Sequence, residues 1–460
     1  MMRKNVFVVA LVLLVALVSC AEHECVWKEV SVTEPTCASE GERVLKCNGC
    51  GATRTEKIAK LPHELTDDGW KFNDVDFVYE QKCKSCNEMQ YKEIESGVRI
   101  QGIAGFENRL FETANEAYAE IKAFLKENGG VDDNPYIEES LKNDEFDKVF
   151  IDNGKITWVV YGEQDLIESS ETPYLLTFGR VSAHYNHDRH ISGVTVVGGN
   201  EKSKVNCMSE VDRGGSGHFY SVAQETGQKN NDDVGFSLVF KDVSIEAMDD
   251  KMNFVPNTNH KAGDYFVFDN CKIKGFLKAL GQKYSLVVNN CNIETFDGNY
   301  AIFVQGNTYT TEAKVEIKNT SISNSRGVNI DQATAEARIV GNTFVNCGNL
   351  TDDEDNNYYG VIQVTKGANV LVDGNTIENC KGNAIWVWSS KGVGAFTGKL
   401  TVKDNLIKDC SYAFADYGNE YTLESSGNRI SGTNVDKCFA RVMEDGNVVY
   451  KEIDAETKLQ

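Results

Sequence analysis

Two Cys-x-x-Cys pairs near the start of the 460-residue chain have the residue types and the spacing of a metal site. A tetrahedral zinc site takes four thiolate or imidazole ligands, and such pairs supply them two at a time. The expected ligands are Cys47, Cys50, Cys83 and Cys86, with His23 and His63 as alternatives. Disulfides are as well supported as zinc ligation if the protein is exported, because oxidising compartments favour them. Cys25–Cys37 is then the expected disulfide.

The two pairs belong to a duplicated segment. Lys46–Ile58 and Lys82–Ile94 share the lysine, both cysteines and the closing isoleucine at the same spacing, with Trp27 and Trp70 upstream. This segment has few apolar residues, so it needs disulfides or a bound metal ion to stabilise its fold. The stretch HECVW…PTC…CNGCG…TEKI…LPH is similar to the short Cys/His/Trp repeats of bacterial surface proteins, which implies a structural or anchoring role. We expect no redox role, because no βαβ pattern surrounds the pairs.

A second group of residues is suited to binding sugars. In the stretch Asn383–Trp388 alternation directs Ile385 and Val387 inward and both tryptophans outward. Exposed indoles stack on sugar rings, while amide groups bond to hydroxyls. The expected ligand-binding residues are Trp386, Trp388, Gln363, Asn329 and Tyr417. Alternatively, the loop Leu350–Tyr359 covers the tryptophans and makes them a second core.

Cleavage of a polysaccharide needs two carboxylates at one bond, or a base with a group that neutralises the substrate. The acidic candidates are Asp297, Asp331 and Asp416, with Arg326 or Lys366 in register. None stands in a recognisable catalytic constellation, so whether the protein is an enzyme stays uncertain.

Other polar clusters are expected to be solvated loops. His184, His187 and His190 lie three apart among loop residues, which favours ordinary histidines over a metal site. The acidic run 352–355 is a loop that could bind calcium.

An internal repeat predicts the elements that position these side chains. Three segments share one pattern and end in cysteine: ARIVGNTFVNC at Cys347, VLVDGNTIENC at Cys380 and LTVKDNLIKDC at Cys410. One apolar anchor recurs in eight units at intervals of 20 to 33 residues: Ile245, Ile273, Ile293, Ile322, Phe344, Ile377, Ile407 and Ile430. Apolar residues five and seven positions before each anchor predict a strand with one face inward.

A polar corner stands three positions before each anchor. The corner residues are types that tolerate left-handed backbone: Asp242, Asn270, Asn290, Asn319, Gly341, Gly374, Asp404 and Gly427. Cysteines also recur at fixed registers, and stacked small apolar side chains explain them without a catalytic thiol: Cys271, Cys291, Cys347, Cys380 and Cys410.

Such units cannot bury their apolar faces alone, so they must stack, each strand pairing with its copy about 4.8 Å away. On these repeats the chain resembles the right-handed parallel β-helix, or pectate-lyase-like, superfamily over about residues 191–436. The resemblance implies an all-β solenoid, a fold that hosts lyases, hydrolases, epimerases, tailspikes and adhesins. The signature motifs of pectate lyases and polygalacturonases have no counterpart here, so no catalytic residue is carried over.

Both ends of the solenoid are expected to be capped. The residues from Thr113 to Glu116 fit a capping box and predict one amphipathic helix that stops at Gly129 and covers the N-terminal mouth. Val442–Tyr450 predicts a hairpin at the other end. The expected divisions are 1–20 signal peptide, 21–96 Cys-rich module, 97–190 N-terminal cap, 191–436 parallel β-helix and 437–460 C-terminal cap hairpin and tail.

The N-terminus predicts export. The apolar run Val6–Val18 follows Arg3 and Lys4 and is too short to span a bilayer. Its end, 17–20, resembles a bacterial lipobox, which implies that Cys20 carries a lipid; ordinary cleavage nearby is the alternative. The protein is then anchored at the cell surface or in the periplasm, or it is secreted, and it meets the membrane only through the lipid.

The net charge of −22 disfavours nucleic acid as a partner, and an acidic polysaccharide would need a local basic patch or a bridging cation. We therefore expect an exported lipoprotein whose β-helix presents a carbohydrate- or ligand-binding face without catalysis. The alternative is a polysaccharide lyase or glycoside hydrolase that uses the same face.

Overall fold

The computed structural model describes residues 24–127, 155–168, 193–209, 217–218, 237–248, 252–254, 257–258, 264–281, 283–295, 299–306, 312–331, 336–348, 360–365, 369–388, 398–417, 421–433, 438–444 and 447–453. The chain divides into two compact units, residues 1–93 and 94–460. We call them unit 1 and unit 2. The signal segment with Cys20, His23, the three histidines 184, 187 and 190, and the acidic run 352–355 lie outside the described residues.

Unit 1 contains two three-stranded antiparallel sheets. Copy 1 consists of β1 (Trp27–Thr33), β2 (Gly41–Cys47) and β3 (Thr53–Ile58), and copy 2 of β4 (Lys71–Asn73), β5 (Val78–Lys82) and β6 (Met89–Lys92). The buried apolar residues of the described part of unit 1 are few: Cys37, Leu45, Cys47 and Cys83. Three of these four residues are cysteines, so the hydrophobic effect alone contributes little to the stability of this unit.

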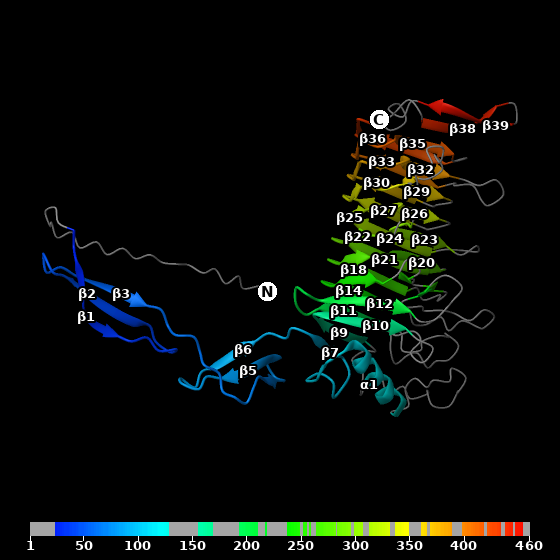
Figure 1. Ribbon diagram of the computed structural model, residues 1–460. Helices are drawn as coiled ribbons and strands as arrows, with labels where there is room; N and C mark the ends of the chain where they lie inside the picture. Colours follow the sequence, from blue (N-terminus) through cyan, green and yellow to red (C-terminus); the bar gives the residue numbers. More distant parts are fainter. Residues whose placement is uncertain are drawn as a thin grey trace. The chain divides into compact units, whose positions relative to one another are not determined.

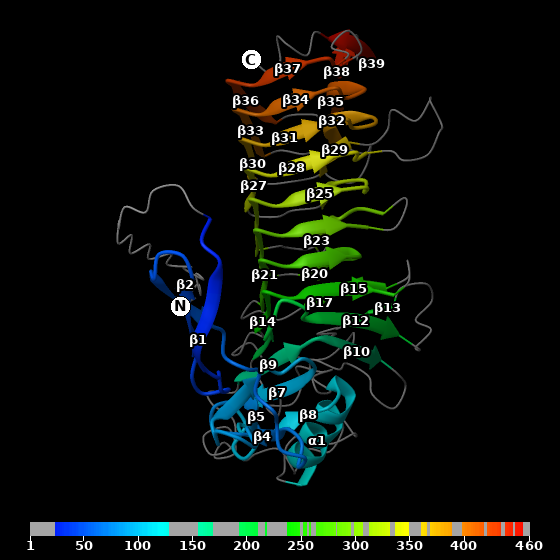
Figure 2. The ribbon, with the colours of Figure 1, turned by 60° about the vertical axis from the view of Figure 1, so that its left-hand side comes forward.

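Unit 2 is built of three long sheets to which successive coils of the chain contribute strands (Figures 1 and 2). The first sheet contains β7 (Gly97–Gln101), β8 (Leu110–Phe111), β9 (Lys155–Tyr161), β11 (Gly193–Gly198), β14 (Ser237–Lys241), β18 (Asp264–Asp269), β21 (Lys283–Asn289), β24 (Glu312–Lys318), β27 (Glu336–Val340), β30 (Asn369–Asp373), β33 (Lys399–Lys403) and β36 (Thr422–Ser426). The second contains β10 (Glu163–Glu168), β12 (Lys204–Ser209), β15 (Ser244–Ala247), β19 (Lys272–Lys274), β22 (Asn292–Glu294), β25 (Ser321–Ser323), β28 (Thr343–Val345), β31 (Thr376–Glu378), β34 (Leu406–Lys408) and β37 (Arg429–Ser431).

The third sheet contains β13 (Gly217–His218), β16 (Met252–Phe254), β17 (Asn257–Thr258), β20 (Phe276–Gly281), β23 (Ile302–Gly306), β26 (Val328–Asp331), β29 (Gly360–Thr365), β32 (Asn383–Trp388), β35 (Tyr412–Tyr417), β38 (Cys438–Glu444) and β39 (Asn447–Ile453). Neighbouring coils pair in parallel, and the antiparallel pairs of unit 2 lie at the ends, where β7 pairs with β8 and β9, and β38 with β39. Parallel stacking begins at β9 and β10, before the expected boundary at residue 191.

The repeat predicted the register of the second sheet correctly. All eight anchors pair coil to coil, from Ile245 with Ile273 to Ile407 with Ile430. The first seven are buried, whereas Ile430, in the last strand of this sheet, is only partly covered. The eight predicted corner residues all have positive φ, between 50° and 68°. The all-β solenoid is therefore confirmed.

An asparagine ladder stands one position after the corners and was not predicted. The amide Oδ1 of Asn375 accepts the backbone N–H of Asn342 at 2.9 Å, and Oδ1 of Asn405 accepts the N–H of Asn375 at 2.9 Å. Asn375 Nδ2 donates to the carbonyl of Ile339 at 2.8 Å. Thr320 and Asn428 continue the ladder at its two ends. Because these amides are buried, each bond satisfies a backbone group at a bend that sheet pairing cannot reach.

The helix α1 (Ala114–Glu127) caps the first coils. Thr113 Oγ1 accepts the N–H of Glu116 at 3.1 Å, as the capping box predicted. The helix buries Ala117 and Ile121 in the same core as the strands. At the other end β38 and β39 form the predicted hairpin.

Candidate metal centres and candidate ligand-binding face

Unit 1 gathers its cysteines into two clusters. The first centre is Cys25, Cys47 and Cys50; the second centre is Cys37, His63, Cys83 and Cys86. Within each centre the ligand atoms lie within 4.8 Å of one another, so these residues can hold a metal ion. The expected grouping of both Cys-x-x-Cys pairs around one ion is wrong, because the structure assigns one pair to each centre. His63, named as an alternative ligand, belongs to the second.

The sulfur separations are those of ligands around a shared ion. Sγ of Cys25 and Sγ of Cys50 lie 3.7 Å apart, as do Sγ of Cys37 and Sγ of Cys83. A disulfide needs about 2.05 Å. Metal–sulfur bonds of about 2.3 Å in a tetrahedron put two sulfurs about 3.8 Å apart. The Cys25–Cys37 bridge is also wrong, since each cysteine belongs to a different centre.

Ionisation of these thiols is coupled. Hydrogen bonding to Cys47, together with burial, raises the pKa of Cys25 to about 12, and hydrogen bonding to Cys86 raises the pKa of Cys37 to about 11. The backbone N–H of Cys86, with help from His63, lowers the pKa of Cys83 to about 6. Cys25 and Cys37 therefore stay protonated at neutral pH unless a cation compensates the charge of their thiolates, and a divalent ion would supply that compensation.

Three of the five predicted sugar-binding residues fall on one ladder of the third sheet, and the backbones of the other two, Trp388 and Tyr417, pair two positions further along. Phe303, Asn329, Gln363 and Trp386 pair in register from β23 to β32. Trp386 is 4% exposed, Gln363 6% and Asn329 5%, so the expectation of an exposed indole at Trp386 is wrong. The side chains of Trp388 and Tyr417 lie outside the described residues, although their backbones pair between β32 and β35.

A half-buried group of aromatic and basic residues continues that ladder toward the N-terminus. We call Phe276, Lys278, Tyr300, Phe303 and Arg326 the aromatic–cation patch. Their contacts are as follows: the ring centroid of Phe303 lies 6.3 Å from that of Phe276 and 5.8 Å from that of Tyr300, Lys278 Nζ lies 5.7 Å from the Phe303 centroid, and Arg326 Cζ lies 5.9 Å from the Tyr300 centroid.

The patch is joined to the buried amides. Tyr300 Oη donates to Gln363 Oε1 at 2.8 Å, while Oδ1 of Asn329 is buried without a hydrogen-bond partner among the described residues. Burial lowers the pKa of Lys278, which makes no ion pair with a described residue. Aromatic faces, cations and amides thus meet on one stretch of the third sheet, a combination that suits a hydroxylated anion.

The proposed acids do not form a pair among the described side chains. Asp331 is half-buried, and its Oδ1 accepts a hydrogen bond from Thr365 Oγ1 at 2.7 Å. The backbone of Asp416 pairs with that of Val387, but its side chain lies outside the described residues, as do Asp297 and Lys366.

The recurring cysteines of the β-helix are buried, at most 5% exposed. Cys347 Sγ donates to the carbonyl of Ile322, and Cys410 Sγ to that of Ile377, both at 3.4 Å. Burial inside the coil supports the expectation that these thiols are packing residues.

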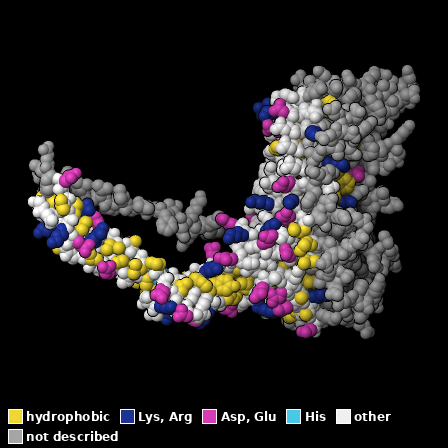
Figure 3. All heavy atoms as spheres, in the orientation of Figure 1, with side chains coloured by type: hydrophobic (Ala, Val, Ile, Leu, Met, Phe, Trp, Pro, Cys, Tyr) yellow, Lys and Arg dark blue, Asp and Glu magenta, His cyan; other side chains and the backbone are white. Residues whose placement is uncertain are grey.

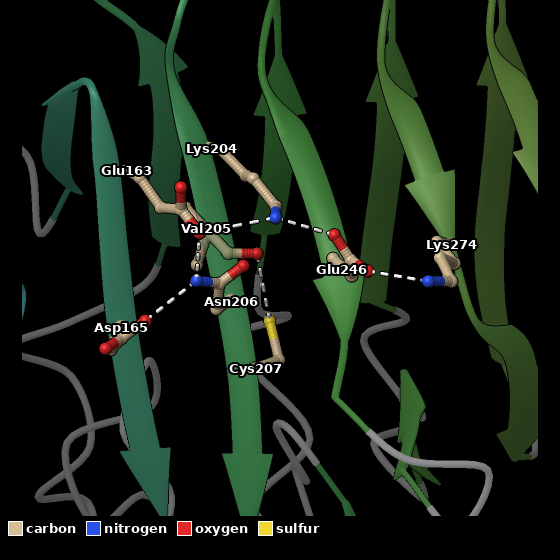
Figure 4. A network of polar contacts seen from close by, with 8 residues as sticks. All are labelled: Glu163, Asp165, Lys204, Val205, Asn206, Cys207, Glu246 and Lys274. Carbon is tan, nitrogen blue, oxygen red and sulfur yellow. Dashed lines mark hydrogen bonds and ion pairs between the residues drawn. The ribbon is translucent and has the colours of Figure 1, made fainter.

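Opposite charges pair between neighbouring coils of the second sheet. In the network of Figure 4, Lys204 Nζ lies 2.7 Å and Lys274 Nζ 2.8 Å from the carboxylate of Glu246. Asn206 Nδ2 donates to Glu163 at 2.7 Å and to Asp165 at 2.8 Å. Figure 3 shows basic side chains interspersed among acidic ones on the visible side. These pairs are stacking contacts between coils.

Comparison with known proteins supports the fold. Residues 279–450 match the family model of the right handed beta helix region. No curated protein and no solved structure matches the chain significantly. None of the described helices is long and apolar enough to cross a membrane. The family match and the stacked parallel sheets together show that unit 2 folds as a right-handed parallel β-helix.

Proposed function

We propose that this β-helix protein binds an acidic glycan through the aromatic–cation patch and does not cleave it. The patch carries the proposal, because it concentrates two cations beside three aromatic rings in a chain of net charge −22. Because the chain is strongly acidic, an acidic polysaccharide needs such a local basic patch in order to bind. Uronic acid rings offer an apolar face for Phe303 and a carboxylate for Lys278.

Binding is proposed rather than cleavage because the sequence has no counterpart to the signature motifs of pectate lyases or polygalacturonases. The buried amide of Gln363 accepts the hydrogen bond of the Tyr300 hydroxyl and so holds that ring of the patch in place.

We also propose that both centres of unit 1 bind zinc and that the unit serves as a spacer behind a lipid on Cys20. The donor set of the second centre supports zinc, because three thiolates with one imidazole are a common structural set for this ion, and the first centre offers three thiolates. The apolar run and lipobox-like end support export and anchoring.

Binding of the purified full chain to polygalacturonate, alginate and a neutral glucan tests the patch. We expect the two acidic polymers to bind and the neutral one to bind weakly or not at all. Lys278→Ala should weaken binding about tenfold, since a partly desolvated cation is worth about 1–2 kcal/mol. The matched control is Lys272→Ala, an exposed lysine of β19 in the second sheet.

Equal binding by both variants would place the site elsewhere. Unsaturated or reducing ends in the incubated polymer would replace the binding function with that of a lyase or hydrolase.

A further inference from the structure

The two Cys-x-x-Cys turns of unit 1 are held by the same three backbone hydrogen bonds. In copy 1, Cys47 N–H donates to Ala52 O at 2.8 Å and Gly51 N–H to Cys47 O at 2.9 Å. In copy 2, Cys83 N–H donates to Glu88 O at 2.9 Å and Asn87 N–H to Cys83 O at 3.1 Å. Gly51 and Asn87 both have positive φ, 74° and 63°. The turns are therefore structural equivalents.

The third bond aligns the segment that enters each turn. Asn48 N–H donates to Val26 O at 3.0 Å, and Lys84 N–H donates to Glu64 O at 2.8 Å. The residue before the accepting carbonyl is Cys25 in copy 1 and His63 in copy 2. An imidazole thus occupies in the second centre the place that a thiolate occupies in the first.

The remaining ligand of the second centre comes from the other copy. Cys37 lies in the connection between β1 and β2 of copy 1, yet its Sγ is 3.7 Å from Sγ of Cys83 in copy 2. The side chain is 7% exposed. The equivalent connection in copy 2, between β4 and β5, contains neither cysteine nor histidine: Asp74, Val75, Asp76 and Phe77. Copy 2 therefore receives a ligand and passes none on.

Other described contacts between the copies are few. Leu61 N–H donates to Thr36 O at 3.1 Å beside Cys37, whereas the following segment, with Thr66 donating to Lys82 O, belongs to copy 2. Lys60 is exposed in the connection between β3 of copy 1 and β4 of copy 2. With so small an apolar core, a metal bond between Cys37 and copy 2 is the principal crosslink available.

We propose that the metal at the second centre is a clamp between the copies: it joins Cys37 of copy 1 to His63, Cys83 and Cys86 of copy 2 and makes unit 1 one rigid spacer. This rests on metal binding by unit 1. The first centre, whose three described ligands all belong to copy 1, stabilises its own turn and does not couple the copies.

Zinc content and limited trypsin digestion of the full chain test the clamp. We expect two zinc ions per chain in the unmodified protein and one in each of Cys37→Ser and Cys25→Ser. Cleavage after Lys60 should become several-fold faster in Cys37→Ser and remain unchanged in Cys25→Ser, because only Cys37 crosses between copies.

Two conservative variants guard against simple misfolding. His63→Cys gives copy 2 the ligand that copy 1 has at this place. This variant should therefore retain two zinc ions, and its cleavage after Lys60 should stay as slow as in the unmodified chain. Cys25→His is the reciprocal change and should behave likewise. Cobalt substitution checks the tetrahedral geometry of each through its visible absorption.

The possible failures are distinguishable. If the unmodified chain binds no zinc or cobalt, the proposed zinc sites fail. If it binds two ions and Cys37→Ser keeps both, or loses one without faster cleavage after Lys60, the clamp is wrong while zinc binding stands.

Discussion

Sγ of Cys37 and Sγ of Cys83 lie 3.7 Å apart, although 46 residues separate them in the chain. Cys37 lies in the connection between β1 and β2 of copy 1, whereas Cys83 directly follows β5 of copy 2. Their proximity brings the two copies of unit 1 together, so a metal ion bound between them would connect the copies.

Removal of metal should unfold unit 1 and leave the β-helix intact. Unit 1 buries few apolar side chains, whereas the coils of unit 2 share one continuous core. We expect EDTA to abolish the protection of residues 24–93 in hydrogen exchange and to leave β14 to β34 protected. Equal loss of protection in both units would contradict a role of the metal that is confined to unit 1.

Asn375→Ala should destabilise the β-helix by about 3 kcal/mol. The substitution removes the bonds from Asn375 Nδ2 to Ile339 O and from Asn342 N–H to Asn375 Oδ1, leaving buried backbone groups unsatisfied. Urea denaturation measures the loss. The control is Asn428→Ala at the partly exposed end of the ladder, for which we expect about 1 kcal/mol. Similar costs at both positions would show that burial does not govern the ladder.

Two glycines of the β-helix, Gly348 and the corner residue Gly374, should differ sharply in their tolerance of substitution. Gly348 has φ 105°, and a Cβ there would lie 1.8 Å from Lys381 O, so Gly348→Ala should cost about 3 kcal/mol. Gly374 has φ 62° with nothing within 4 Å of its Cβ position, and asparagine occupies the equivalent corner at Asn319. Gly374→Asn should therefore change the unfolding free energy by less than about 1 kcal/mol. Thermal melts of both variants check the contrast.

Glu246 should contribute to the stability of the β-helix at neutral pH and not in acid. Lys204 first, and then Lys274, lower the pKa of its carboxyl below 4.5. A lowered folded-state pKa stabilises above the unfolded value, and the gain is lost as pH falls through the folded value. Glu246→Gln should cost about 1 kcal/mol at pH 7, and the difference from the unmodified chain should vanish as the pH falls below the lowered pKa of the folded state. A difference that persists in acid would assign the effect to packing.

Glycan binding at the aromatic–cation patch should weaken with added salt and with loss of the Phe303 ring. Ring stacking is worth about 1 kcal/mol, so Phe303→Ala should reduce affinity for polygalacturonate roughly fivefold. The salt slope should fall in Lys278→Ala and stay unchanged in Phe303→Ala, because only the first removes a charge. Titration calorimetry at two salt concentrations separates the two contributions.

Much of the β-helix was determined by local sequence. Alternation before each anchor and a left-handed residue at each corner operate within a few residues, so they are visible without the fold, from Asp242 to Gly427. The asparagine ladder also had a local signal that was missed, since an asparagine directly follows each of the corners Gly341, Gly374, Asp404 and Gly427. Side chains that repeat at one register must stack once the coils do.

The ligand sets and the burial of the third-sheet face were decided only by tertiary structure. The spacing of two Cys-x-x-Cys pairs is equally compatible with one centre or two, and only the closure of a 46-residue loop brings Cys37 to Cys83. Strand alternation correctly sends Trp386 to the side of the sheet opposite Ile385, but alternation reports direction, not exposure. Whether an outward side chain is covered depends on segments distant in the sequence. The neighbours of Trp386 in sequence therefore could not show that it is only 4% exposed.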